Sequence, residues 1–175
     1  RLPKYDYIYL GDTARSPYGN KSQAEIYQFA CQAVDFLFNK ECRLIILACN
    51  TASSKALRKI QRQYLPRFWP ERRVLGVIIP AVEDSILKLK NHNGRVGVMA
   101  TKTTVDSKVF EKEFKKKNRQ IKVFTKTCPL LVSLVEEGRH DFPENRSILE
   151  KYLKPLLKKK IDILILGCTH FSYFK

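Results

Sequence analysis

Features typical of membrane and secreted proteins are missing from this chain. No apolar run in its 175 residues approaches the ~20 residues that a membrane-spanning helix needs. The opening residues, Arg1-Leu2-Pro3-Lys4, contain no apolar segment of the signal-peptide type. The five cysteines are odd in number and none lies in a Cys-x-x-Cys pair, which favours reduced thiols over a disulfide framework. These absences predict a cytoplasmic protein with no membrane partner.

Nucleotide-binding and metal-binding motifs are also missing. The seven glycines form neither a Walker-type phosphate loop nor the Gly-x-Gly-x-x-Gly motif of dinucleotide-binding proteins. The three histidines and five cysteines do not have the spacing of a metal site. We therefore predict no metal and no cofactor.

Acidic residues are scarce relative to basic ones. The chain has 17 Asp and Glu against 33 Lys and Arg, a net charge of +16. Such an excess of positive charge is typical of proteins that bind nucleic acids. However, the lysine clusters lie on predicted helices, without the interleaved aromatic side chains of a single-strand stacking platform. Solvated helix faces are the favoured interpretation, and a surface that binds polyanions is the alternative.

What the chain does contain is an alternation of apolar strands and amphipathic helices. Hydrophobic residues make up 44% of it, an ordinary share for a globular protein. Strands are predicted at residues 5–10, 43–48, 73–79, 95–100, 121–125 and 161–166. A helix is predicted after Ser22, because Ser22 and Glu25 match the capping-box pattern. Further helices are predicted at residues 51–64, 80–89, 104–117, 130–137 and 145–159. Residues 65–72 contain two prolines and are predicted to be loop.

This alternation predicts an α/β protein with mainly parallel sheets flanked by helices. The sharpest break in the pattern is Asn91-His92-Asn93-Gly94. We therefore expect two pseudo-symmetric lobes, residues 1–92 and 93–175, with the active site between them.

One short sequence motif occurs in each predicted lobe. An apolar run and a small residue precede Cys49, and the same pattern precedes Cys168. Such runs are typical of strands buried on both faces, and open α/β sheets bind ligands where their strands end. We expect neighbouring helix N-termini to lower the pKa of both thiols. Two thiols facing one small molecule could remove a proton from one side of a carbon and return it to the other.

The remaining cysteines fit structural roles. Cys31, Cys42 and Cys128 lack the strand and the polar residues that follow the other two, and buried thiols usually act as small hydrophobic groups. A hydrolase built on Cys168 and His170 is less favoured, because a base two residues from its nucleophile is unusual and the second thiol would stay unexplained.

Polar residues next to the strand ends are candidate substrate ligands. Asn50-Thr51 and Thr169-His170 follow the two thiols and could hold a carboxylate or an ammonium group, or could simply cap helices. The loop Gly11–Gly19 could form a wall of the site. Thr101-Lys102-Thr103-Thr104 lies at the corresponding edge of the second lobe and could contact an anion or cap its helix.

Several of these motifs together resemble the bacterial glutamate racemases. They occur in the family's order and span nearly the whole chain. They are Gly11-Asp12-Thr13-Ala14-Arg15 with Pro17-Tyr18-Gly19-Asn20-Lys21-Ser22, Ala48-Cys49-Asn50-Thr51-Ala52-Ser53, Gly76-Val77-Ile78 with Pro80-Ala81, and Gly167-Cys168-Thr169-His170-Phe171.

The resemblance implies a cofactor-independent interconversion of L- and D-glutamate that supplies peptidoglycan synthesis, and it leaves room for a homodimer. It assigns the opposed acid and base to Cys49 and Cys168. Asp12 and Glu136 match acids that tune the thiols, and His170 would assist Cys168. The substrate contacts that it implies are Tyr18, Gly19, Asn50, Thr51, Thr104, Thr169 and His170.

The chain also departs from the family's pattern. The family begins about one strand and one helix earlier, with an Asp-Ser-Gly turn that contacts substrate, and it continues past the second cysteine. Phe171-Ser172-Tyr173 replaces the proline expected after His-Phe. We therefore expect an incomplete first lobe. An aspartate or hydantoin racemase of the same superfamily and a non-catalytic, basic nucleic-acid-binding fragment are the alternative functions.

Overall fold

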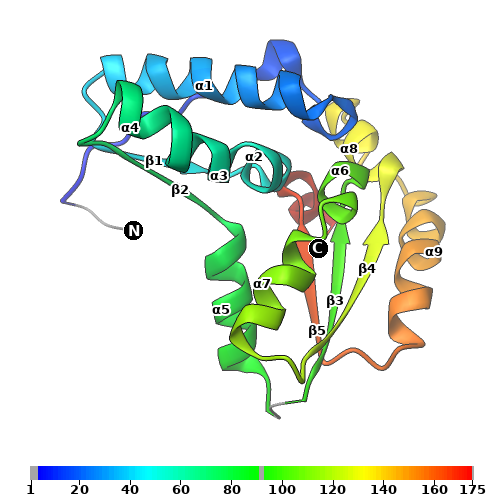
Figure 1. The fold of residues 1–175 in the computed structure, drawn as a ribbon. Coiled ribbons are helices and arrows are strands. Elements are labelled where there is room, and N and C mark those ends of the chain that lie inside the picture. Colours follow the sequence, from blue (N-terminus) through cyan, green and yellow to red (C-terminus); the bar gives the residue numbers. More distant parts are fainter. Residues whose placement is uncertain (1–3, 91–92, 175) are drawn as a thin grey trace.

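A computed structural model describes residues 4–90 and 93–174 as two parallel β-sheets with helices packed on them (Figure 1). The first sheet pairs β1 (Leu44–Leu47) with β2 (Arg73–Gly76). The second has the order β4-β3-β5, with β3 (Arg95–Ala100) between β4 (Lys122–Thr127) and β5 (Ile163–Gly167). The α/β class and the parallel pairing predicted from the sequence are confirmed.

The helical segments follow the predicted alternation. They are η1 (Thr13–Arg15), η2 (Tyr18–Asn20), α1 (Gln23–Asn39), α2 (Asn50–Lys55), α3 (Leu57–Lys59), η3 (Ile60–Tyr64), α4 (Leu65–Phe68), α5 (Ile78–Lys88), α6 (Lys102–Asp106), α7 (Val109–Lys117), α8 (Pro129–Glu136), α9 (Asn145–Leu157) and η4 (Thr169–Phe174). The capping box at the start of α1 has both of its hydrogen bonds, as Ser22 and Glu25 predicted.

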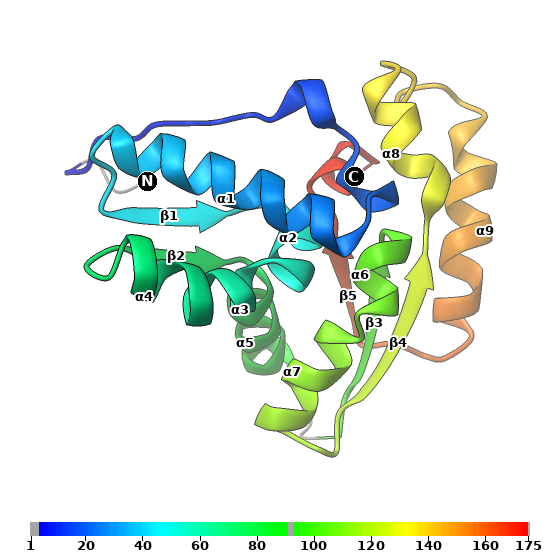
Figure 2. The ribbon, with the colours of Figure 1, turned by 45° about the horizontal axis from the view of Figure 1, so that its top comes forward.

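Helices cover one face of the first sheet. Ile45 of β1 and Val74 of β2 point into a core that α1 and the helical run from α2 to α4 complete. Val34 of α1 and Ile60 are fully buried in this core. The helices lie over the strands in Figure 2. Helices, strands and the loop that precedes α1, whose Tyr18 packs against the same core, form the first sheet unit.

The second sheet is covered on both faces. Val96 and Val98 of β3 pack against α5 and α7, whereas Met99 faces the opposite side, toward α8, α9 and η4. This alternation follows from the two-residue period of a strand. The resulting three layers form the second sheet unit, in which every strand ends toward the first unit (Figure 1).

The predicted division into residues 1–92 and 93–175 stays a prediction. Of the break that suggested it, Asn91 and His92 lie outside the described residues. Helix α5 precedes that break but packs with Ile78 and Val82 on the second sheet.

The predicted strand at residues 5–10 is wrong. No strand forms there, and Tyr9 is 92% exposed. The prediction that β1 is buried on both faces is also wrong, because Ile46 is 61% exposed while its neighbour Ile45 is 4% exposed. Apolar runs report strand propensity, but a strand also needs a partner strand and a covering layer, and the described residues supply a helical layer on only one face of β1.

Two predicted helix boundaries also need correction. Residues 65–72 are not all loop, because α4 continues the preceding helical run with Pro66 in its first turn, where proline is tolerated. The helix predicted at residues 104–117 is two helices, α6 and α7, separated at Lys108, which has a left-handed backbone with φ of 53°.

Candidate active site

Cys49 lies where β1 ends and α2 begins. It is the N-cap residue of α2, so Asn50 and Thr51 occupy the first helical turn, and both are buried. Backbone N–H groups of Thr51 and Ala52 interact with the sulfur. These N–H groups belong to the helix start, where they have no intrahelical partner, and they favour the Cys49 thiolate although the side chain makes no capping hydrogen bond.

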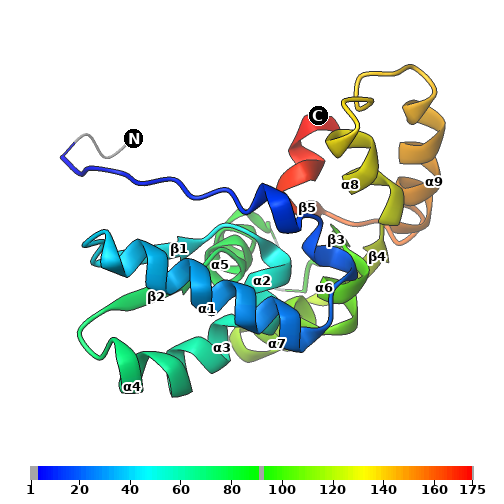
Figure 3. The same ribbon diagram turned by 90° about the horizontal axis from the view of Figure 1, so that it is seen from above.

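Cys168 occupies the equivalent place at the end of β5. Thr169 and His170 follow it in η4, and backbone N–H groups of His170 and Phe171 interact with its sulfur. Both sulfurs thus lie at the carboxyl end of a strand, next to N–H donors, as predicted from the motif that precedes each cysteine. The beginning of α2 and the C-terminal segment approach each other where the two sheet units meet (Figures 1 and 3).

The two thiols are close enough to influence each other's ionisation. Burial raises the pKa of Cys168 to about 11, and the negative charge of an ionised Cys49 contributes to this rise. Burial also raises the pKa of Cys49 above its ordinary value, although the N–H groups of α2 act in the opposite direction. The predicted net lowering of both pKa values is therefore wrong, because loss of hydration outweighs the helix N-terminus.

A chain of hydrogen bonds extends from Cys168 to the first sheet unit. Nδ1 of His170 lies 3.7 Å from Sγ of Cys168, and Nε2 lies 2.7 Å from Oε1 of Glu136. The Ser16 hydroxyl donates to the same Oε1 at 2.7 Å. Hydrogen bonds from Ser16 and, to a smaller extent, His170 lower the pKa of Glu136, so this carboxylate is ionised at neutral pH.

Three threonine hydroxyls meet beside Cys49. Oγ1 of Thr51 lies 3.0 Å from Oγ1 of Thr101 and 3.4 Å from Oγ1 of Thr104, and Thr101 donates to Thr104 at 3.1 Å. All three side chains are buried. Thr51 comes from α2 and the other two from the start of α6, so this cluster joins the two sheet units at the candidate site.

Asp12 organises the loop that precedes α1. Nε of Arg15 donates to its carboxylate at 2.8 Å, and the Tyr18 hydroxyl also donates to it. Burial alone would raise the pKa of Asp12, but these two hydrogen bonds and the positive charges of Arg15 and Lys21 together outweigh burial and lower it. Burial and the Asp12 carboxylate raise the pKa of Tyr18, and the charge of an ionised Cys49 adds to this, which places the ring near that thiol.

Gly19 is held from the opposite unit. The Thr103 hydroxyl donates to its carbonyl oxygen at 2.6 Å. A Cβ on Gly19 would lie 3.2 Å from the Thr101 side chain, so the loop backbone packs closely on the start of α6. Glycine fits this close approach because it has no side chain.

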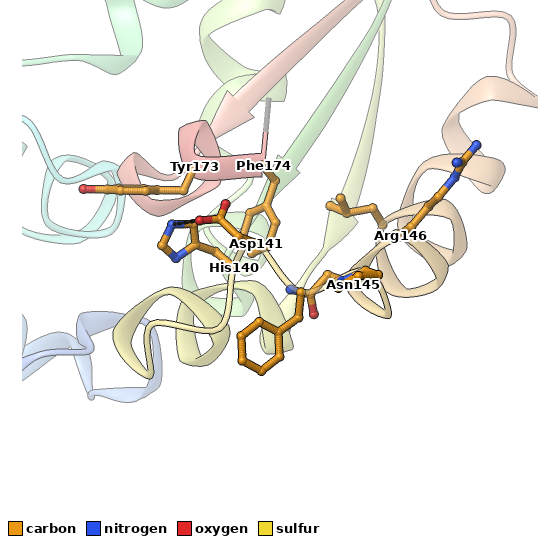
Figure 4. Close-up of a pocket in the computed structure, with 9 residues that line it drawn as sticks. His140, Asp141, Asn145, Arg146, Tyr173 and Phe174 are labelled. Atoms are coloured by element: carbon orange, nitrogen blue, oxygen red, sulfur yellow. Dashed lines mark ion pairs between the residues drawn. The ribbon is translucent and has the colours of Figure 1, made fainter.

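A cavity of about 400 Å³ lies apart from the predicted site residues (Figure 4). It is lined by residues that include His140, Arg146 and Tyr173, and none of the predicted site residues lines it. Within residues 4–90 and 93–174, no group of three or more His, Cys, Asp or Glu side chains is arranged to hold a metal ion. No helix in the described part of the chain is long and apolar enough to cross a membrane.

Comparison with known proteins identifies the family of the chain. The family model of Asp/Glu/hydantoin racemases matches residues 1–175. The chain belongs to this racemase family. It is 41% identical over 175 residues to the glutamate racemase of Neisseria gonorrhoeae, covering 100% of this chain and 62% of that protein. The chain therefore spans less than two thirds of the length of that relative.

Solved racemase structures share the fold. A glutamate racemase from Francisella tularensis, crystallised with D-glutamate, is 38% identical and superposes with a TM-score of 0.85 over 99% of this chain and 62% of its own. The RacE1 glutamate racemase of Bacillus anthracis is 34% identical, with a TM-score of 0.88 over 100% of this chain and 64% of its own.

Within this racemase-family fold, hydrogen bonds and charge interactions gather most of the sequence-predicted residues into two linked groups. One contains Cys49, Thr51, Thr104, Asp12 and Tyr18. The other is Cys168, Thr169, His170 and Glu136, and the two thiols interact across the groups. Asn50 is buried next to Cys49, and Gly19 adjoins Tyr18.

Three hydroxyls were predicted only as members of larger segments: Ser16 in the loop Gly11–Gly19, and Thr101 and Thr103 in the segment after β3. Ser16 and Thr103 each form a hydrogen bond that joins the two sheet units. Thr101 lies at the centre of the threonine cluster. Its position directly after β3, like that of each thiol after its own strand, was the available signal. No signal in the sequence pairs Ser16 with Glu136.

Proposed function

We propose that this racemase-family chain carries the catalytic centre of a glutamate racemase that works without a cofactor. The observation that carries the proposal is the pair of thiols, Cys49 and Cys168, which end strands of two different sheets and sense each other's charge. The two glutamate racemase structures that superpose on the chain support glutamate as the substrate.

In the proposed reaction, one thiolate removes the α-proton of glutamate and the opposite thiol donates a proton to the other face. The thiol that began as base ends protonated, and the other ends as thiolate, so atoms and charge balance over a turnover. When Cys168 is the base, His170 first accepts its proton through Nδ1, because Glu136 favours the tautomer with a proton on Nε2. His170 keeps that proton while the Cys168 thiolate takes the α-proton and the Cys49 thiol donates its own. Asp12 positions the Tyr18 ring beside Cys49.

The α-proton of an amino acid is weakly acidic, so a thiolate alone is insufficient. We infer that Asn50, Thr51, Thr104 and Thr169 hold the substrate carboxylate and ammonium groups as negative charge develops. The burial that raises both thiol pKa values also limits water in the site and strengthens these interactions. Tyr18 and Gly19 would form the adjoining wall.

The deciding experiment replaces each thiol in the full-length protein. Cys49→Ser and Cys168→Ser should each reduce racemisation at least about 100-fold, the scale of a lost general acid or base. Circular dichroism of L- and D-glutamate incubations measures the rate, and Cys42→Ser serves as the matched control. Retained racemisation in both variants would remove the proposal.

Aspartate or hydantoin racemisation is the second candidate, favoured by the breadth of the matching family. It uses the same two thiols, so D-aspartate and hydantoin incubations of the wild-type protein distinguish it from glutamate racemisation. A basic module that binds nucleic acid is the third. It would be favoured by a duplex-DNA titration with steep salt dependence and no racemase turnover.

The cellular setting stays a prediction. Production of D-glutamate would supply peptidoglycan synthesis in the cytoplasm, and a homodimer is compatible with the proposal. Size-exclusion chromatography with light scattering on the full-length protein tests the dimer.

A further inference from the structure

Ser16 joins the two sheet units at the edge of the candidate site. It follows η1, where its backbone N–H donates to the carbonyl oxygen of Thr13 at 3.2 Å, and its side chain is half-buried. Its hydroxyl donates to Oε1 of Glu136 at 2.7 Å, across 120 residues of sequence. A hydroxyl on a loop of the first unit is therefore bonded to a carboxylate on α8 of the second.

That carboxylate oxygen has a second partner. Nε2 of His170 lies 2.7 Å from the same Oε1. The Glu136 side chain is 45% exposed, so packing alone does not set its orientation. Two hydrogen-bond partners on one oxygen restrict its rotation, and Ser16 is the stronger of the two in lowering the pKa of Glu136.

The orientation of Glu136 matters for the histidine. When Nε2 of His170 carries the proton and donates a hydrogen bond to Glu136, Nδ1 is an acceptor. The Thr169 hydroxyl lies 3.4 Å from the same Nδ1. Nδ1 lies 3.7 Å from Sγ of Cys168, at hydrogen-bond range for sulfur. A carboxylate that turns away would let the imidazole ring rotate and would weaken this contact.

We propose that Ser16 is a positioning residue: it aligns Glu136 so that His170 presents an unprotonated Nδ1 to the Cys168 thiol. The role rests on the proposed function, in which Cys168 exchanges protons with substrate. Ser16 acts through Glu136 and His170, and a second contact, from Thr103 to Gly19, holds the other end of the same loop.

Site-resolved alkylation tests this role without requiring turnover. The full-length protein is treated with iodoacetamide at pH 8, and mass spectrometry of peptides follows each cysteine separately. Ser16→Ala should slow alkylation of Cys168 by about threefold to tenfold, the range of one ordinary hydrogen bond, and leave Cys49 unchanged. Ser16→Thr keeps a hydroxyl and should retain most of the Cys168 rate.

Turnover and a double-mutant cycle give the second readout. Ser16→Ala should lower kcat in both directions by a similar factor, with KM for glutamate changed less than about twofold, because Ser16 acts through other side chains. In a Glu136→Ala background the Ser16→Ala substitution should have little further effect on Cys168 alkylation, since the shared acceptor is gone.

The outcomes separate this role from the proposed function. An unchanged Cys168 alkylation rate in Ser16→Ala overturns the role of Ser16. An undiminished loss in the Glu136→Ala background, or an equal loss in Ser16→Thr, overturns it too. Slowed alkylation without any glutamate racemisation by the wild-type protein would instead overturn the proposed function and leave the Ser16 contact in place.

Discussion

At the scale of single residues, burial controls the chemistry of the two thiols. The N–H groups at the start of α2 favour the Cys49 thiolate, but loss of hydration favours the thiol more strongly. The same balance raises the pKa of Cys168 to about 11. Both sulfurs are therefore mostly protonated at pH 7. A base such as His170, next to Cys168, is then needed to accept the thiol proton in the proposed reaction.

This balance predicts an alkaline reactivity profile. Because only the thiolate reacts, alkylation of Cys168 should rise about tenfold per pH unit from pH 7 to pH 10 without levelling off. Free cysteine in the same solution levels off near its own pKa of about 8.5. Peptide mass spectrometry after brief iodoacetamide treatment measures both. A plateau for Cys168 below pH 9 would contradict the raised pKa.

At the scale of elements, the two similar motifs before Cys49 and Cys168 lie in different surroundings. The small residue before the thiol is Ala48 after β1 and Gly167 at the end of β5. Ala48 is exposed, whereas a Cβ on Gly167 would lie 2.9 Å from the Met99 carbonyl oxygen and 3.1 Å from Cβ of Ala100. The central strand β3 therefore leaves no room for a side chain next to Cys168.

The substitution Gly167→Ala should lower the free energy of unfolding by about 1–3 kcal/mol, because the new methyl group meets backbone that cannot move freely. Urea unfolding followed by circular dichroism measures this change. Ala48→Gly, at the exposed equivalent position, is the control and should cost less than about 1 kcal/mol. Equal stability of Gly167→Ala and wild type would show that β3 and β5 can separate at this point.

Helix α6 and the loop around Gly19 form another such contact between elements. Thr103→Val removes the hydroxyl that donates to the Gly19 carbonyl and keeps the shape of the side chain. If Gly19 borders the substrate as proposed, KM for glutamate should rise about threefold to tenfold, with a smaller change in kcat. Thr103→Ser retains the donor and should behave like wild type. A loss confined to kcat would argue against this role of the loop.

At the scale of the whole molecule, the two sheets differ in how they are covered. Within the described part of the chain, helices pack on both faces of β4-β3-β5 but on one face of β1-β2. The other face of β1-β2 exposes Leu44, Ile46 and Leu75 to 50%, 61% and 49%, respectively. Adjacent exposed apolar side chains of this kind promote association and dye binding.

The adjacent pair Ile45 and Ile46 tests this asymmetry in the 175-residue chain. Ile46→Thr should change the free energy of unfolding by less than about 0.5 kcal/mol and reduce binding of the dye ANS, because the side chain is already in water. Ile45→Thr should cost about 2–4 kcal/mol, since it buries a hydroxyl and leaves a gap. Comparable costs for the two would mean that both faces are covered in solution.

Much of the fold could be predicted from local pattern. The capping box of Ser22 and Glu25 predicted α1, and the limits predicted for β3, residues 95–100, agree with the structure. The strand predicted at residues 5–10 failed because strand formation depends on a neighbour that the local pattern does not contain. The break at Lys108 was missed because a left-handed lysine has no sequence signal comparable to glycine.

The sequence by itself determined the class of fold and the two thiols at strand ends, since apolar periodicity and strand-end polar residues are local properties of the chain. Only the tertiary structure decided that the thiols share one environment, that burial overrides the helix N-termini, and that Ser16 reaches Glu136. Those outcomes depend on distances between segments far apart in sequence and on how completely water is excluded. Neither quantity can be predicted from a single segment of the chain.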